Sequence, residues 1–402
     1  MDACVLWVWL AESVGAGSTV WAKLHQKGYS VSQVYQSTAE DLLPLLPRQR
    51  AAVEKLAQKS TAKAEAIVQT CHALGIRIVH FGHPEYPASL LALKTPPAVL
   101  YVKGNLSLSA MPFPVGIVGT RHPSDYGIKE TYALSTLCAK EGGTVVSGLA
   151  LGIDTVAHLG ALAVGGKTVA VLASGVDAVT PQKHQAVAEH ICQNGALVSE
   201  YPPGTAPRTY HFPCRNRLVA AMSSALAVME GSLDSGAMIT AKDAMSLEKP
   251  LYALPGRVGE SQAEGPMQLL SKGARLLLDS GVILRDHQIA FAPLSKPDVK
   301  EFPSLSEAEQ QFGLSSAPSH REKKTSFPKE APPKKQPKAA PDLSFLTEEE
   351  KALYLRIPED GTCLPDELVT EGATAVLVMR WLTHLEMEGL ILRHAGGRVS
   401  RA

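Results

Sequence analysis

Six short apolar runs alternate with helical stretches through the middle of this chain, and this alternation constrains its fold most strongly. The runs are continuous rather than alternating in polarity, which is typical of strands that are buried on both faces of a parallel sheet. The predicted strands are Val115–Val118, Thr144–Ser147, Thr168–Leu172, Ala196–Ser199, Ala225–Met229 and Leu251–Leu254. The predicted helices between them are Asp125–Glu141, Thr155–Val164, Gln182–Asn194, Arg215–Met222 and Gly236–Leu247. We therefore expect an α/β fold whose parallel sheet carries helices on both faces.

Ligands of such sheets bind beyond the carboxyl ends of the strands, so the residues that follow each strand carry most of the functional information. Gly119-Thr120-Arg121 follows the first predicted strand. A glycine, a helix N-terminus and a forked guanidinium suit an anion, but a tight turn with a surface arginine explains the same residues. Glycine-rich loops also follow the second and fifth strands, where Ser147-Gly148 and Ser235-Gly236 offer backbone amides to an anion.

The segment between Glu200 and Glu230 contains no acidic residue, although it contains several arginines and aromatic residues. Guanidinium groups bind phosphates and aromatic rings stack on unpaired bases, so this composition favours a single-stranded nucleic acid. Arginines that pair with acidic residues of neighbouring loops are the alternative. The residues that we single out here are Arg208, Phe212, Arg215, Asn216 and Arg217, and the last three are expected to open a helix.

Two further patterns are weaker. Ala161–Thr168 formally satisfies a relaxed Walker A pattern, but it ends a helix and leads into a strand, which is the reverse of a phosphate-binding loop. Asp154 and His158 have the i, i+4 spacing of metal ligands, but no third ligand is visible, so we favour an N-cap at Asp154 and a packed His158. The sequence also lacks the G-x-S-x-G and H-E-x-x-H motifs of hydrolases. We predict no catalytic residue, no metal site and no cofactor.

Composition divides the chain into four segments. Residues 1–74 look helical, and Val14–Gly17 resembles the turn of a SAM/helix-hairpin-helix-like domain, with a helical packing domain as the alternative. Residues 75–290 form the predicted α/β core. Residues 291–342 are rich in Pro and Lys and are expected to be an extended linker, either a solvated tether or a polyanion contact. Residues 343–402 have the pattern of a winged helix, with predicted helices at Thr347–Ile357, Pro365–Glu371 and Thr374–Glu388 and a turn at Gly396-Gly397.

The whole chain has 402 residues, and its 39 Lys and Arg are balanced by 39 Asp and Glu. A polyanion partner therefore has to be recognised by locally segregated charge rather than by net charge. The short apolar start, which follows Asp2, does not qualify as a signal peptide. The six scattered cysteines read as reduced thiols, so we expect a cytoplasmic protein with no membrane partner.

The motifs after the strands, taken in order, resemble the DNA-processing protein DprA family, also called Smf. They are Gly119-Thr120-Arg121, Ser147–Asp154 with Ala157-His158, Ser199-Glu200-Tyr201, Phe212–Arg217, Ser235–Ala241 and Leu254–Gly256, and they span about Leu74–Ile289. The resemblance implies a Rossmann-like, doubly wound and mostly parallel core that has no established catalysis and forms homodimers. This sequence departs from the family pattern at Thr180-Pro181, His184 and Gly265-Pro266-Met267.

The resemblance also implies a function. Members bind single-stranded DNA that enters during natural transformation, protect it, and help to load the RecA recombinase over single-strand-binding protein. It assigns DNA contacts to Arg121, Arg208, Phe212 and the Arg215–Arg217 triplet, and suggests that Lys167 lies on a basic surface path. The competing hypothesis is a nucleotide phosphoribohydrolase of the LOG, lysine-decarboxylase-like type. That family carries a catalytic glutamate in one of its loops. The comparable loop of this chain is Ser235–Ala241, and it contains no glutamate.

The C-terminal segment, residues 343–402, carries six basic and ten acidic residues. Duplex binding requires neutralisation of phosphates, which this balance does not supply. We therefore expect a protein-contact or regulatory module there rather than an autonomous DNA-binding domain.

Overall fold

The structure is a computed structural model, and it describes residues 2–287, 303–314 and 346–358. Beyond these it describes residues 363–368, 377–378, 381–382, 385, 390–393 and 398–401. The chain divides into two compact units, Met1–Ser319 and His320–Ala402, and each is described by itself.

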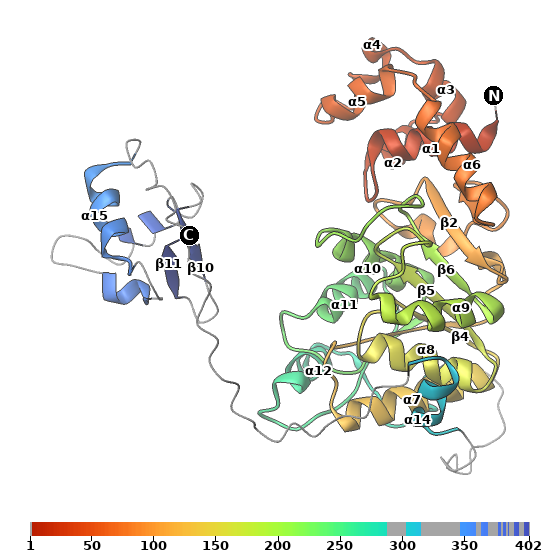
Figure 1. The fold of residues 1–402 in the computed structure, drawn as a ribbon, viewed down its shortest axis with the longest axis vertical. Coiled ribbons are helices and arrows are strands. Elements are labelled where there is room, and N and C mark those ends of the chain that lie inside the picture. Colours follow the sequence, from red (N-terminus) through yellow and green to blue (C-terminus); the bar gives the residue numbers. More distant parts are fainter. Residues whose placement is uncertain are drawn as a thin grey trace. The chain divides into compact units, whose positions relative to one another are not determined.

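A mixed nine-stranded sheet forms the centre of the first unit (Figure 1). The strand order is β1-β2-β6-β5-β4-β3-β7-β8-β9; β1, β2 and β6 pair antiparallel, and every other neighbouring pair is parallel. Within the parallel region the chain runs from β3 outward to β6 and then returns to β7 beside β3, so the strand order reverses between β3 and β7. The strands are β1 (Arg77–His80), β2 (Val99–Gly104), β3 (Pro114–Val118), β4 (Thr144–Ser147), β5 (Lys167–Leu172), β6 (Ala196–Ser199), β7 (Ala225–Val228), β8 (Leu251–Ala253) and β9 (Arg275–Leu276).

Helices cover both faces of the parallel region, as predicted. Alternate residues of β3 point to opposite faces: Val115 and Ile117 pack in the cluster with α7 and α8, whereas Val118 packs with α10 and α11. All six predicted central strands are present, and their ends agree with the predictions to within one residue. The helices of this region are α7 (Asp125–Lys140), α8 (Ile153–Ala163), α9 (Gln185–Asn194), α10 (His211–Met222), α11 (Gly236–Ser246), α12 (Ser261–Ser271) and α13 (Val282–Asp286).

Three helix starts differ from the predictions, and α8 begins two residues early, at Ile153 rather than Thr155. Helix α10 begins at His211 rather than at Arg215, because Pro213 falls in the first helical turn, where its missing N–H costs nothing. Gln182–His184 forms a 3₁₀ turn, and α9 begins only at Gln185. The earlier start of α10 places Arg215 and Arg217 in its second turn instead of at its exposed beginning.

Six N-terminal helices form a bundle, and two of them, α1 and α6, contact the strands β1 and β2 at one side of the sheet. The sequence patterns did not predict these two strands. Helix α1 is apolar around most of its circumference and is buried among the other five. The Trp7 ring stacks on His80 of β1 at a centroid distance of 5.3 Å and meets Trp21 edge-on at 4.7 Å. The helices are α1 (Ala3–Val14), α2 (Val20–Gln26), α3 (Val31–Gln36), α4 (Ala39–Leu42), α5 (Arg50–Ala57) and α6 (Ala62–Ala73).

A stretch of the predicted linker is helical rather than extended. Helix α14 (Leu305–Gln311) begins with a capping box between Ser304 and Glu307, a local signal that the proline density of the segment outweighed in the sequence analysis. Ala308 and Phe312 are buried, α14 packs on α8, and Phe312 meets His190 of α9 edge-on at 4.9 Å. The basic second half of the predicted linker lies outside the described residues.

The second unit is described only partially. Helix α15 (Glu348–Arg356) begins with a Thr347–Glu350 capping box, and strands β10 (Ile391–Arg393) and β11 (Val399–Arg401) pair antiparallel. A 3₁₀ turn lies at Pro365–Leu368. The predicted third helix, Thr374–Glu388, falls mostly outside the described residues, as does the Gly396-Gly397 turn.

Among the described residues, the helices are all too short or too polar to cross a lipid bilayer.

Docking of α14 is testable by denaturation. Phe312→Ala should lower the free energy of unfolding by about 3 kcal/mol, because a buried ring is removed from the core. The exposed neighbour Gln311→Ala is the matched control and should change it by less than about 0.5 kcal/mol. Urea denaturation of both variants provides the measurement, and equal stabilities would contradict the docked helix.

Candidate nucleic-acid interface

A pocket of about 330 Å³ opens where β3 and β7 end, at the reversal of strand order. This is the position at which doubly wound sheets bind ligands. The pocket brings together eight of the residues that the sequence analysis singled out, from separate loops and from the start of α10: Gly119, Thr120, Arg121, Phe212, Arg215, Asn216, Ser235 and Gly236.

Arg121 and Phe212 form the exposed side of this pocket. The Arg121 guanidinium lies over the Phe212 ring, with 5.3 Å between its central carbon and the ring centroid. Arg121 is exposed, and within the residues that the structure describes it has no carboxylate partner. An unpaired guanidinium beside a half-buried ring offers a phosphate contact and a stacking surface together.

Arg215 forms the inner wall of the pocket and is only 5% exposed. Its Nη1 donates to the carbonyl oxygens of Gly148 at 2.6 Å and Val171 at 2.5 Å, so one side chain joins the ends of β4 and β5. A side chain at Gly148 would overlap this guanidinium, which explains the glycine there. Arg215 was expected to be a DNA contact, but its hydrogen bonds lie inside the protein.

Asp154 holds the loop that follows β4 and contains Gly148. Its carboxylate accepts hydrogen bonds from the backbone N–H groups of Gly148 at 3.1 Å and Ala150 at 3.4 Å. Gly152 occupies the N-cap position of α8, so the prediction that Asp154 caps this helix was wrong. Burial raises the pKa of Asp154 and lowers that of Arg215, and the attraction between the two opposes both shifts.

Glu230 fixes the opposite wall, and the sequence analysis did not identify it. Its carboxylate accepts hydrogen bonds from the Ser124 backbone at 2.8 Å and from the Ser124 hydroxyl at 2.5 Å, and its carbonyl accepts from the Thr120 N–H at 2.7 Å. It therefore holds the Gly119–Arg121 loop against the end of β7. The only sequence signal was its place after a strand.

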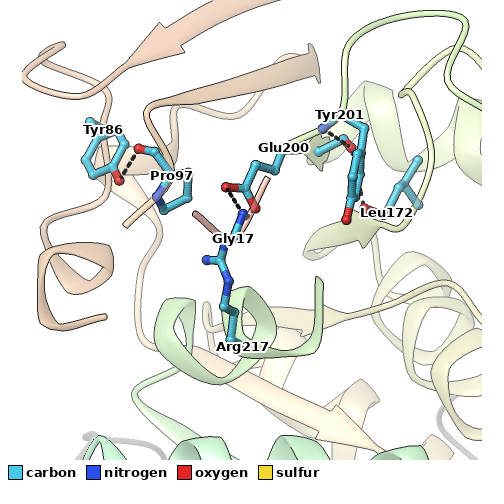
Figure 2. A network of polar contacts seen from close by, with 8 residues as sticks. Gly17, Tyr86, Pro97, Leu172, Glu200, Tyr201 and Arg217 are labelled. Carbon is cyan, nitrogen blue, oxygen red and sulfur yellow. Dashed lines mark hydrogen bonds and ion pairs between the residues drawn. The ribbon is translucent and has the colours of Figure 1, made fainter. Parts of the chain in front are cut away.

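Arg217 is absent from the lining of this pocket, although it lies on the same helix as Arg215. It is buried and forms an ion pair with Glu200, whose other carboxylate oxygen accepts the Gly17 N–H at 3.0 Å. Figure 2 shows Glu200 between Gly17 and Arg217. For Arg217 the arrangement matches the alternative interpretation of the acid-free segment, in which its arginines pair with acids from neighbouring loops.

The remaining predicted residues are separate from the pocket. Arg208 is exposed and donates to the Tyr210 hydroxyl at 3.2 Å. Ser147 is buried and donates to the Ile117 carbonyl at 2.6 Å, so its side chain joins β4 to β3. Lys167 is exposed at the first residue of β5, whereas the pocket lies beyond the other ends of the parallel strands.

His158 packs inside the core, where it hydrogen-bonds to a neighbouring side chain. It is fully buried, and its Nδ1 shares a 2.7 Å hydrogen bond with the Thr168 hydroxyl. Within the described residues there is no group of three or more His, Cys, Asp or Glu side chains placed to hold a metal ion. The preference for a packed histidine is confirmed.

Comparison with known proteins gives consistent matches over this region of the chain. Residues 77–288 match the model of a family described as DNA recombination-mediator protein A. The chain is 42% identical to Protein Smf of Synechocystis over 205 residues, which cover 50% of this chain and 51% of that protein. It is 32% identical to DNA processing protein DprA of Bacillus subtilis over 257 residues, 64% of this chain and 85% of that protein. The X-ray structure of DprA from Streptococcus pneumoniae aligns with a TM-score of 0.63 at 29% identity, over 71% of this chain and 99% of that one. The match with the Synechocystis relative thus spans only about half of its length.

The burial of His158 predicts a pH dependence of stability. Burial lowers its pKa from 6.5 to about 3, so between these values the unfolded chain binds a proton that the folded chain does not. The contribution of His158 to the free energy of unfolding is highest above pH 6.5. Below that pH it falls by about 1.4 kcal/mol for each pH unit, until the pKa of the folded state is reached. Urea denaturation at a series of pH values should show a shallower decline in His158→Gln than in the wild type. Parallel curves would contradict the prediction.

Proposed function

Because the chain belongs to the DNA recombination-mediator protein A family, whose model matches more than half of its residues, we propose that it binds single-stranded DNA and acts on it without catalysis. The observation that carries the proposal is the pairing of the exposed Arg121 guanidinium with the Phe212 ring at the mouth of the pocket. Phosphate and base contacts of this kind do not depend on sequence. The strand would lie along the ends of β3 and β7, with Asn216, Ser235 and Gly236 lining the inner side.

The position of the DNA contacts follows the exposure of the predicted residues. Arg121, Arg208 and Phe212 are the proposed direct contacts, and Arg215 and Arg217 are proposed to hold the surface on which DNA lies. Lys167 is kept as a peripheral contact on a longer path over the surface. The hydrogen bonds of Arg215 and the ion pair of Arg217 support this division.

The broader role rests on family membership. We propose that the protein protects DNA taken up in natural transformation and helps RecA to replace single-strand-binding protein, working as a homodimer in the cytosol. Its six free cysteines support a reducing compartment. The N-terminal helices are proposed as a SAM/helix-hairpin-helix-like domain, and the second unit as a winged helix that contacts protein.

The phosphoribohydrolase alternative finds little support in the site. Ser235–Ala241 contributes no glutamate, and the carboxylates of Asp154 and Glu230 already accept hydrogen bonds from the protein. A general acid or base needs access to a substrate proton. Glu230 is not among the residues that line the pocket, and Asp154, which does line it, is only 7% exposed. Release of a free base from a nucleoside monophosphate by the pure protein would revive this alternative.

Gel-shift titration with single-stranded and duplex oligonucleotides at two salt concentrations tests the proposal. We expect tighter binding of the single strand, weakened by salt and little affected by sequence. Equal affinity for duplex, or no binding of the single strand, would overturn the proposal.

Variants of two pocket arginines separate contact from support. Arg121→Ala should raise the Kd for single-stranded DNA about five- to tenfold while leaving the melting temperature unchanged, because an exposed side chain is lost. Arg215→Ala should lower the free energy of unfolding by about 3 kcal/mol, because it leaves Asp154 buried without its partner. The exposed Arg50→Ala on α5 is the matched control for charge and should alter neither quantity. Unchanged affinity in Arg121→Ala would place the DNA elsewhere.

A further inference from the structure

A second pocket shares the start of α10 with the first. We call it the Tyr210 groove; it has a volume of about 370 Å³ and is lined both by the core and by the N-terminal helices. Tyr210 and His211 line this groove, whereas the next residue, Phe212, lines the pocket that holds Arg121. On its other side the groove is lined by Gly15, which follows α1, and by Trp21 of α2. Three consecutive aromatic rings therefore join the two pockets.

The groove has an aromatic wall that already forms a stack. The Tyr201 and His211 ring centroids lie 4.0 Å apart with the rings nearly parallel, and Tyr210 meets His211 edge-on at 4.5 Å. Tyr210 is 60% exposed although its ring is large and mostly apolar. Because Tyr210 stands edge-on to the Tyr201–His211 stack, its exposed ring offers a free face for a further planar group. Pockets for small organic ligands range from about 300 to 1,000 Å³, and this groove falls within that range.

The charges around the groove favour an uncharged occupant. Its charged lining residues are Glu12, Lys63 and Glu200; Glu12 pairs with Lys63, and Glu200 pairs with Arg217. Burial and the nearby Arg208 lower the pKa of His211, so its ring is neutral at neutral pH. Lys63, the one described lysine or arginine on these walls, is thus already paired. Arg208 is not a lining residue, but it is exposed and hydrogen-bonded to Tyr210, which is.

We infer that the Tyr210 groove is a second nucleobase site, which takes a base of the same DNA strand that stacks on Phe212. The base would lie against Tyr210, the connecting phosphate would contact Arg208, and the N-terminal helices would close the groove from the other side. The inference rests on the proposed function, since it extends the same strand. It gives the N-terminal helices a direct role in holding DNA.

Photocrosslinking of the full chain tests where the bases lie. The probe is an oligothymidylate with a single 5-iododeoxyuridine, moved one position at a time along the strand, and adducts are mapped by mass spectrometry. We expect adducts at Phe212 from one probe position and at Tyr210, His211 or Trp21 from a position a few nucleotides away. Adducts confined to Phe212 would overturn the inference and leave the proposed function intact.

Tyr210 variants provide a matched pair. Tyr210→Ala should weaken binding of a long oligothymidylate about tenfold, since stacking on one ring is lost. Tyr210→Phe keeps the ring and loses only the hydrogen bond with Arg208, so we expect binding close to that of the wild type. A short oligothymidylate that fills only the Phe212 pocket should bind both variants and the wild type equally.

The outcomes separate the two claims. A wild type that binds no single strand contradicts the proposed function itself. Normal binding of the long oligonucleotide by Tyr210→Ala, with unchanged adducts, contradicts the second base site alone. Circular dichroism melting of the variants provides the folding control, because an exposed ring should be removable without loss of stability.

Discussion

The proposed DNA surface depends on the hydrogen bonds that the buried Arg215 guanidinium donates to the protein backbone. Strand ends in a parallel sheet leave carbonyl groups without ladder partners, and such groups are costly when they are buried. Arg215 donates to the carbonyls of Gly148 and Val171 at once, and it lies on the helix that also carries Phe212. The position of the stacking ring is thereby tied to the sheet. Gly148 makes the approach possible, and Asp154 holds the loop that contains it.

A second buried arginine on α10 has a comparable structural role. Arg217 and Glu200 neutralise each other, and Glu200 also binds the Gly17 amide in the turn between α1 and α2. Gly17 has a positive φ of 72°, a backbone conformation that residues with a side chain rarely adopt. Because one helix carries both arginines, the pocket at Arg121 and the Tyr210 groove are positioned together. The turn between α1 and α2 is in this way attached to the α/β core.

The sequence predicts the central strands closely because continuous apolar runs have few alternative structures in a chain of this size. The two edge strands β1 and β9 and the neighbouring β2 were not predicted, since such short strands carry a weak pattern. The position of the pocket was predictable, because strand ends meet at one edge of the sheet. The depth of each arginine was not: Arg121, Arg215 and Arg217 look alike in sequence, and only tertiary partners distinguish an exposed cation from a buried one. The position of Glu230 after a strand did not reveal its role for the same reason, because its partners Ser124 and Thr120 are distant in sequence.

Burial of Arg215 and Arg217 changes what the acid-free segment between Glu200 and Glu230 means. The segment looks strongly cationic, yet Glu200 offsets Arg217 and Asp154 offsets Arg215, so two of its three arginines do not attract phosphates from solution. Arg208, together with Arg121 from another loop, supplies exposed positive charge for the proposed contacts. For a single strand, each phosphate contact adds only about 0.7 to the slope with which the logarithm of the binding constant falls with the logarithm of the salt concentration. In the proposed binding mode, with so few exposed cations at the two pockets, affinity would come largely from stacking on Phe212 and Tyr210. A chain of zero net charge is compatible with that mode.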